Sequence, residues 1–194
     1  ASSACEMVAE VLQYIGDDGI KIKPAEADAM YAGIVIDTNN FMNQAGVRTF
    51  EAAAFLRRNG ADVVRVRKLF RDRLEDYRAR AEAIQKAEIY HGAFAISVCP
   101  SEGLESPTVV GAQAANELLD IVGIKASFIL TQMGDTIYFS ARSIDEINVQ
   151  IIMERLGGGG HRTIAGAQLK GVTIDEAREK LKDLITDMME KGEI

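Results

Sequence analysis

The sequence predicts an α/β protein of two domains, the first mostly helical and the second built on a mixed sheet. Two observations predict it: apolar residues recur at helical spacing as far as residue 86, and short apolar runs typical of strands alternate with helical patterns after residue 88. The chain has 194 residues, of which 47% are hydrophobic and 26% charged, so each domain can bury a core. We expect domains at residues 1–72 and 88–194, joined by a helical linker at 73–87.

In the first domain, helix signals follow one another at short intervals. The opening stretch "SSACEMVAEVLQYI" has apolar positions at helical spacing after a serine that can cap a helix. Pro24 and Glu26 predict the start of a second helix, which runs into "YAGIVIDTNNF" and delivers Asp37. A third helix, "RTFEAAAFLRR", stops at the Asn-Gly pair 59–60, and Asp62 is placed to cap a fourth.

The pattern then changes. The mixed charges of residues 71–86 predict a partly exposed connecting helix, and "GAFAISVCP" predicts a strand. A helix, "PTVVGAQAANELLDIVG", precedes two strands joined by a tight Met-Gly-Asp turn in "KASFILTQMGDTIYFSAR". After the helix "DEINVQIIMERL" and a run of glycines, "TIAGAQLKG" predicts a strand, and Thr173 is placed to cap a final helix.

Composition excludes several classes of protein. The net charge of −7 argues against general nucleic-acid binding, although residues 48–80 are locally basic. No apolar run approaches the roughly 20 residues of a membrane-spanning helix, so we expect no membrane contact by this segment. Only two cysteines, Cys5 and Cys99, are present, which favours a reducing, cytoplasmic setting.

Two segments contain candidate functional residues by residue type, one at Asp37 and one at residues 140–143. Asp37 ends an apolar run and precedes Thr-Asn-Asn, which suits either a carboxylate presented at the edge of a buried element or a helix cap. Strand alternation sends Ser140 and Arg142 to one face and Ser143 into the following turn. An arginine beside hydroxyls suits a phosphate, because its forked donors match phosphate oxygens, and a surface arginine is the alternative.

Four consecutive glycines, residues 157–160, precede His161. Backbone without side chains can bring several N–H donors up to a phosphate, and an imidazole beside them can contact a phosphate or base. The run lacks the Lys and Ser/Thr of the nucleotide-triphosphate phosphate loop. A flexible loop is the alternative.

The segments "GIVIDTNNF", "YFSARSIDEINVQIIMERLGGGGH" and "AGAQ" together resemble the C-terminal half of the DHH phosphoesterases, which carry a DHH-associated domain at their end. Within that family the chain is most similar to membrane-anchored cyclic-di-AMP phosphodiesterases of the GdpP type. The resemblance implies that residues 1–72 are the C-terminal part of the catalytic DHH domain. Residues 88–194 are then the substrate-binding associated domain.

The resemblance also implies a chemistry. Two manganese ions activate water to hydrolyse cyclic-di-AMP to linear pApA, and Asp37 corresponds to a metal ligand. Contacts to the cyclic dinucleotide are implied for Ser140, Arg142, Asn148, Gly157, Gly158, Gly159, Gly160 and His161. The full-length protein is expected to be anchored to the membrane by helices upstream of this chain, and a homodimer is possible.

The chain departs from the family pattern in one respect. The early Asp-x-Asp and the Asp-His-His triplet are absent, and the only histidines are His91 and His161. We therefore expect a truncated piece that is inactive on its own, since one carboxylate cannot hold two divalent ions. Two other interpretations stay open: a soluble DHH enzyme that trims short oligoribonucleotides or linear dinucleotides, and a nucleotide-binding or dimerisation module without catalysis.

Overall fold

The computed structural model describes residues 1–15, 21–42 and 44–194, and it divides the chain into two compact units, residues 1–71 and 72–194. The first unit is helical and the second contains a mixed six-stranded sheet with helices on it. The predicted α/β class is therefore confirmed.

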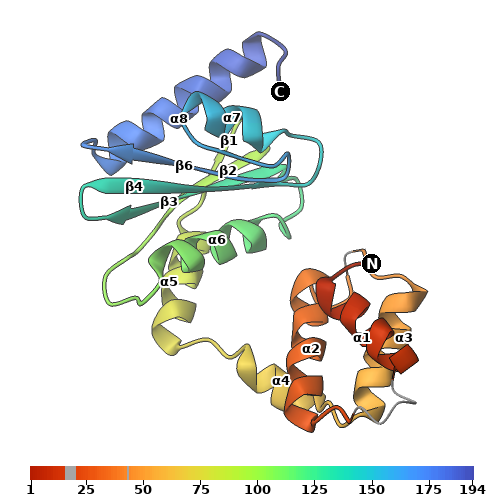
Figure 1. Ribbon diagram of the computed structural model, residues 1–194. Coiled ribbons are helices and arrows are strands. Elements are labelled where there is room, and N and C mark those ends of the chain that lie inside the picture. The colour runs from red at the N-terminus through yellow and green to blue at the C-terminus, as the bar shows by residue number, and fades with distance from the viewer. Residues whose placement is uncertain (16–20, 43) are drawn as a thin grey trace. The chain divides into compact units, whose positions relative to one another are not determined.

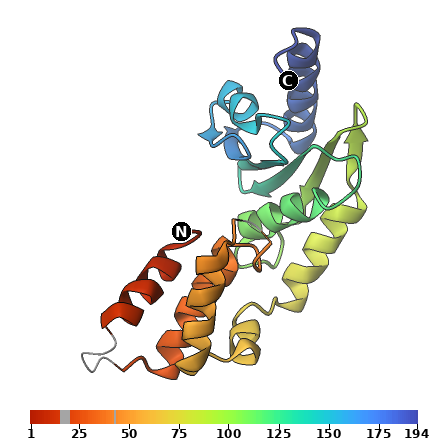
Figure 2. The same cartoon turned by 90° about the vertical axis from the view of Figure 1, so that its right-hand side faces the viewer.

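The described residues of the first unit form a cluster of four helices (Figures 1 and 2). These are α1 (Ala4–Ile15), α2 (Pro24–Asp37), α3 (Val47–Arg58) and α4 (Val63–Leu69). The first three pack pairwise against one another, and α4 packs on α2. Their contact is made largely by small side chains such as Ala9, Ala27 and Ala52, closed by Ile34 and Leu56. Small residues let helix axes approach closely, which explains how short helices share one core.

Local signals place the helix ends as predicted. Ser3 Oγ accepts a hydrogen bond from the backbone N–H of Glu6 at 3.0 Å, and Pro24 occupies the first turn of α2. Asp62 Oδ1 accepts from the N–H of Val64 at 2.7 Å and of Arg65 at 3.2 Å. Each cap satisfies backbone donors that have no partner within the helix.

The second unit is organised by its sheet, whose strand order is β1-β2-β3-β4-β6-β5 (Figure 1). The strands are β1 (Glu88–Tyr90), β2 (Phe94–Cys99), β3 (Ala126–Met133), β4 (Thr136–Ser143), β5 (Gly159–Gly160) and β6 (Ile164–Lys170). The helices are α5 (Leu74–Gln85), α6 (Pro107–Leu118), α7 (Val149–Arg155) and α8 (Ile174–Glu190). Strands β2 and β3 are parallel, because α6 carries the chain back between them, and all other neighbours are antiparallel. Within the described ranges, no helix has both the length and the hydropathy needed to cross a bilayer.

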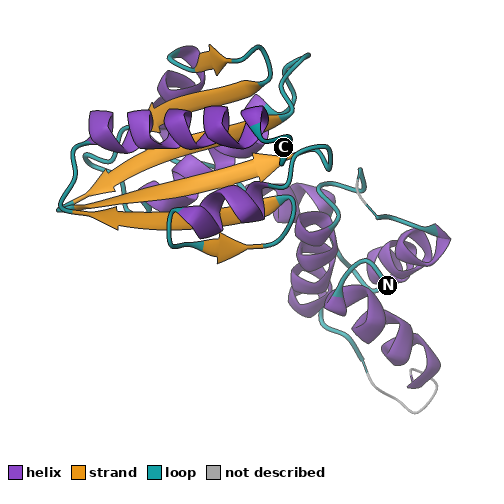
Figure 3. Ribbon diagram, turned by 90° about the horizontal axis from the view of Figure 1, so that it is seen from above, coloured by secondary structure: helices purple, strands orange, loops and turns teal. Residues whose placement is uncertain are grey.

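Helices cover the two faces of this sheet unequally. Helices α7 and α8 lie on one face, and α5 and α6 lie on the other (Figures 1 and 3). On the second face α6 packs over β2, β3 and β4, and it approaches β3 closely at Gly111, where a Cβ would lie 2.6 Å from Thr131 Oγ1. The side chains that β6 sends to this face, Ile164, Gln168 and Lys170, are exposed. The β6 edge of the sheet is thus left open on the α6 side.

The stretch expected as a linker, residues 73–87, contains α5, and this helix packs on α6 and β2. Its small apolar face buries Ala79 and Ala83, and Arg80 is only 8% exposed. The Arg80 guanidinium forms ion pairs with Asp72 at 2.6 Å and Glu117 at 2.7 Å. Helix α5 is accordingly part of the second unit, because its buried alanines contribute to the core of that unit. The mixed charges around these alanines predicted a partly exposed connector instead.

Candidate functional site

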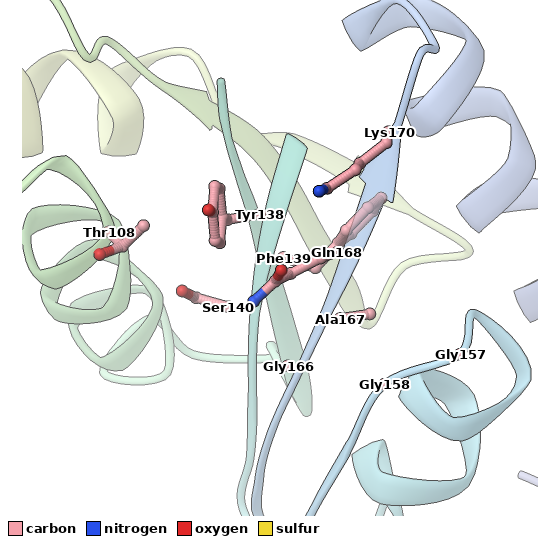
Figure 4. A pocket seen from close by; sticks show the side chains of 10 residues that line it. All are labelled: Thr108, Tyr138, Phe139, Ser140, Gly157, Gly158, Gly166, Ala167, Gln168 and Lys170. Carbon is pink, nitrogen blue, oxygen red and sulfur yellow. The ribbon is translucent and has the colours of Figure 1, made fainter. Parts of the chain in front are cut away.

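An open cleft of about 520 Å³ lies beside the open β6 edge of the sheet, between β4, β6 and the first turn of α6 (Figure 4). Strand alternation directs Tyr138 and Ser140 to this face, and the register sets Tyr138 opposite Gln168 and Ser140 opposite Gly166. The cleft is lined by Thr108, Tyr138, Phe139, Ser140, Gly157, Gly158, Gly166, Ala167, Gln168 and Lys170. Its volume falls within the roughly 300–1,000 Å³ of small-molecule sites.

The polar side chains of the cleft have no partner within the described part of the protein. None of the side chains of Thr108, Tyr138, Ser140, Gln168 and Lys170 makes a hydrogen bond or ion pair there. Hydroxyls elsewhere in the same unit behave differently. Those of Ser97, Ser127 and Ser143 each donate to a backbone carbonyl at 2.6 Å. The cleft therefore offers free donors and acceptors, together with one ammonium and no carboxylate, which favours an anionic ligand.

Arg142 lies two residues beyond Ser140 on the same face of β4. Its Nε donates to Asn116 Oδ1 at 3.0 Å and its Nη1 to the carbonyl of Ala141 at 2.9 Å, while Nη2 has no protein acceptor in the described ranges. Burial lowers the pKa of Arg142, and no carboxylate of the described residues pairs with it. A largely buried guanidinium without a counter-ion is suited to an anion that arrives from solution.

The first two glycines of the run end helix α7. Gly157 has a φ of +80°, its N–H donates to the carbonyl of Glu154 at 2.9 Å, and the N–H of Gly158 donates to the carbonyl of Met153 at 2.8 Å. This is the Schellman arrangement, which favours glycine because the backbone turns left-handed. Both N–H groups are thereby engaged, so neither is free to cradle a phosphate.

The rest of the run lies against β6. Residues Gly159 and Gly160 form β5 and pair with Gly166 and Ala165. A Cβ on Gly158 would lie 2.0 Å from the carbonyl oxygen of Gly166, and one on Gly160 would lie 2.5 Å from Ala165 Cα. Gly158 and Gly160 are therefore required by the close approach of β6, whereas a Cβ on Gly159 would meet nothing within 4 Å. The run is a helix end followed by a paired strand.

Five of the expected contact residues do not line the cleft: Arg142, Asn148, Gly159, Gly160 and His161. His161 is exposed where β5 turns into β6, and it exchanges backbone hydrogen bonds with Ile164 at 2.7 and 3.2 Å. Asn148 begins α7, and its Oδ1 accepts from the N–H of Gln150 at 3.1 Å, which is a capping role. Likewise Ser143, expected in a turn, is the buried last residue of β4.

The cleft thus brings together Ser140, Gly157 and Gly158 of the residues expected from the sequence. It also contains Thr108, Tyr138, Gln168 and Lys170, which sequence reasoning missed. The alternation that selected Ser140 and Arg142 would have selected Tyr138 as well, since it lies two residues earlier on the strand. The residues on β6 required knowledge of the strand pairing.

Asp37 is the exposed last residue of α2. The next residue, Thr38, is the C-cap, and its hydroxyl donates to the carbonyl of Ile34 at 2.6 Å. No group of three or more His, Cys, Asp or Glu side chains converges among the described residues. The residues present therefore do not fit a site for two manganese ions, which needs several converging ligands.

Comparison with known protein families assigns most of the second unit to one family. The DHHA1 domain model matches residues 93–191. The chain belongs to the DHHA1 family. This DHHA1 chain is 45% identical over 193 residues to the cyclic-di-AMP phosphodiesterase GdpP of Geobacillus thermodenitrificans, covering 99% of the chain and 29% of that protein. It is 43% identical over 194 residues to GdpP of Bacillus subtilis, with the same coverage.

These comparisons confirm the resemblance seen in the sequence, and they also show that the chain spans less than a third of the length of these relatives. Among solved structures, an exopolyphosphatase-related protein from Bacteroides fragilis has a TM-score of 0.81 at 20% identity. The match covers 97% of this DHHA1 chain and 57% of that one. It confirms the fold.

Proposed function

We propose that this DHHA1 chain carries the nucleotide-binding module of a cyclic-di-AMP phosphodiesterase, with the ligand on the open face of β4 and β6. The observation that carries the proposal is the set of unpartnered polar side chains in the cleft, continued along β4 by an arginine without a counter-ion. A phosphodiester is an anion rich in acceptors, so it complements such a surface. The names of the relatives supply the candidate ligand.

In this proposal the residues around Arg142 hold one phosphate of the ligand. Arg142 binds a phosphate through its guanidinium, and the Ser140 hydroxyl donates a second hydrogen bond beside it. Gly157 and Gly158 form one wall through their backbone, and at Gly157, where a Cβ would meet nothing within 4 Å, the glycine leaves room for the ligand. His161 lies at the Arg142 end, since Ile164 pairs with both residues, and it is a candidate contact for the part of the ligand outside the cleft.

Hydrolysis to pApA with two manganese ions is proposed for the whole protein. The described residues do not form such a metal site, so the catalytic step is assigned to parts of the protein outside this chain. We expect the chain alone to bind the dinucleotide without hydrolysing it. Asp37 then contributes at most one carboxylate to a site completed by other residues.

Isothermal titration calorimetry of the chain with cyclic-di-AMP tests the proposal, in manganese and again in EDTA. We expect equal binding in both, because no carboxylate, imidazole or thiol lines the cleft. Arg142→Ala should weaken binding by about 10- to 150-fold, the value of a charge-assisted hydrogen bond. A parallel titration with linear pApA tests the alternative that the module serves an enzyme acting on linear dinucleotides.

The matched control is Arg78→Ala, which removes an exposed arginine of α5 that has no ion pair in the described ranges. It should leave the affinity unchanged. Absence of binding by the wild-type chain would refute the proposal. An equal loss in both variants would instead point to non-specific attraction between charges.

A further inference from the structure

The half of the cleft away from Arg142 has features of its own. Tyr138 projects from β4 on the side that faces Thr108 of α6, and the Lys170 side chain extends from β6 towards that side (Figure 4). Gln168 is directly opposite Tyr138 in the strand register, and Lys170 is two residues further along β6. Directly opposed side chains on paired strands lie about 5 Å apart and diagonal ones about 7–8 Å apart. The three side chains therefore form one surface.

Tyr138 differs from the other tyrosines of the second unit. Tyr90 bonds to the Thr186 hydroxyl at 2.8 Å and lies under Lys182, and Tyr77 lies under Arg80. Tyr138 makes no aromatic, cation–π or side-chain hydrogen-bonded contact within residues 72–194. Tyr138 is half-buried, and the part of its ring that is exposed in the polar cleft suits stacking by a nucleobase.

The floor beside Tyr138 is flat because Gly166 has no side chain. A Cβ there would lie 2.8 Å from the carbonyl oxygen of Phe139, so the close pairing of β4 and β6 requires glycine. The amide of Gln168 supplies both a donor and an acceptor for the edge of a base. The ammonium of Lys170 supplies charge for a phosphate.

The two cationic ends of this face are well separated. Arg142 is opposite Ile164, and Lys170 is opposite Thr136, so they stand six residues apart along the paired strands. At about 3.3 Å per residue this is about 20 Å between their backbones. The two phosphates of a cyclic dinucleotide belong to one ring, so such a ligand meets both ends only where the long Arg142 and Lys170 side chains extend towards each other across this span.

We propose that Tyr138, Gln168 and Lys170 form a second nucleotide subsite, in which a purine stacks on Tyr138 and its phosphate meets Lys170. The inference rests on the proposed function, which assigns the first nucleotide to Arg142 and Ser140. It adds a specificity element: the ligand is selected as a dinucleotide because only a dinucleotide occupies both ends.

Calorimetric titration with cyclic-di-AMP and with AMP tests the subsite. Tyr138→Ala should weaken cyclic-di-AMP binding by about 5- to 150-fold, the range for loss of one stacked base, and weaken AMP binding by less, because AMP can still bind at the Arg142 end. Tyr138→Phe keeps the ring and should retain affinity, which separates stacking from a folding defect. Lys170→Gln should weaken cyclic-di-AMP by about 10-fold or more and reduce the salt dependence of binding.

Two matched controls accompany these variants. Tyr14→Ala removes an 88% exposed tyrosine of the first unit, and Lys180→Gln removes an exposed lysine of α8. Both should bind like the wild type. The subsite is overturned if Tyr138→Ala leaves cyclic-di-AMP unchanged, or weakens AMP to the same extent. A wild-type chain that binds neither ligand would refute the proposed function itself, together with the subsite built on it.

Discussion

Replacing Gly158 by alanine should destabilise the second unit strongly. The new Cβ would lie 2.0 Å from the carbonyl oxygen of Gly166 and 2.6 Å from Ala167 Cα, where ordinary contacts begin at 3.4 Å. The obstructing atoms are backbone atoms of a strand paired on its other side with β4, so they cannot rotate away. The chain after α7 must move by more than 1 Å or the pairing of β5 with β6 must open.

Overpacking of this kind costs about 1–3 kcal/mol or more. For a unit of this size, 1 kcal/mol corresponds to a change in Tm of about 3–6 °C, so we expect Tm to fall by about 5–15 °C. Differential scanning calorimetry measures it directly. The loss should appear in the transition of the second unit, because both partners of the contact belong to that unit.

The adjacent glycine provides the control. A Cβ on Gly159 meets nothing within 4 Å, so Gly159→Ala should change Tm by no more than about 2 °C. Equal stability of Gly158→Ala and the wild type would refute the reasoning. So would equal destabilisation by the two substitutions, since the run would then require glycine for flexibility alone.

Two further predictions concern stability. Burial alone would raise the pKa of Glu6, but hydrogen bonds from Ser2 and Thr49 lower it below its ordinary value. The ionised carboxylate therefore adds to the free energy of unfolding above about pH 4.5, and this contribution is lost as the pH falls through the pKa of the folded state. In Glu6→Gln the urea concentration at the unfolding midpoint should therefore fall less between pH 6 and pH 3 than in the wild type. The same pH dependence in both proteins would contradict this. Ser143→Ala removes a buried hydrogen bond to the carbonyl of Ile147 and should cost about 1–2 kcal/mol in the same assay. Ser140→Ala, which removes an unpartnered hydroxyl, should leave the free energy of unfolding almost unchanged. Similar losses of stability in Ser140→Ala and Ser143→Ala would show that the hydrogen bond of Ser143 adds nothing specific.

Local sequence signals predicted most of the secondary structure. Asp62 and Thr173 cap helices as expected, and the two-strand hairpin turns at Gly134 and Asp135. These features depend on interactions over a few residues, which the sequence displays directly. The assignment of α5 depended instead on which distant surface its alanines meet, and no local pattern encodes that.

The site was only partly predictable for the same reason. Alternation along β4 correctly set Ser140 and Arg142 on one face, because that property belongs to a single strand. Lys170 and Gln168 reach the cleft only through the pairing of β4 with β6. The pairing of Gly159 and Gly160 with β6 could not be predicted from the glycine run, since β6 comes later in the chain.

The short length of β5 leaves the outer edge of the sheet incompletely covered. It pairs only with Ala165 and Gly166, while β6 continues to Lys170. An uncovered edge can recruit a strand from another molecule, and a lysine on the edge opposes this because the incoming strand would have to desolvate its charge. Lys170 is therefore placed to oppose edge-to-edge association of the protein, in addition to its proposed contact with a ligand.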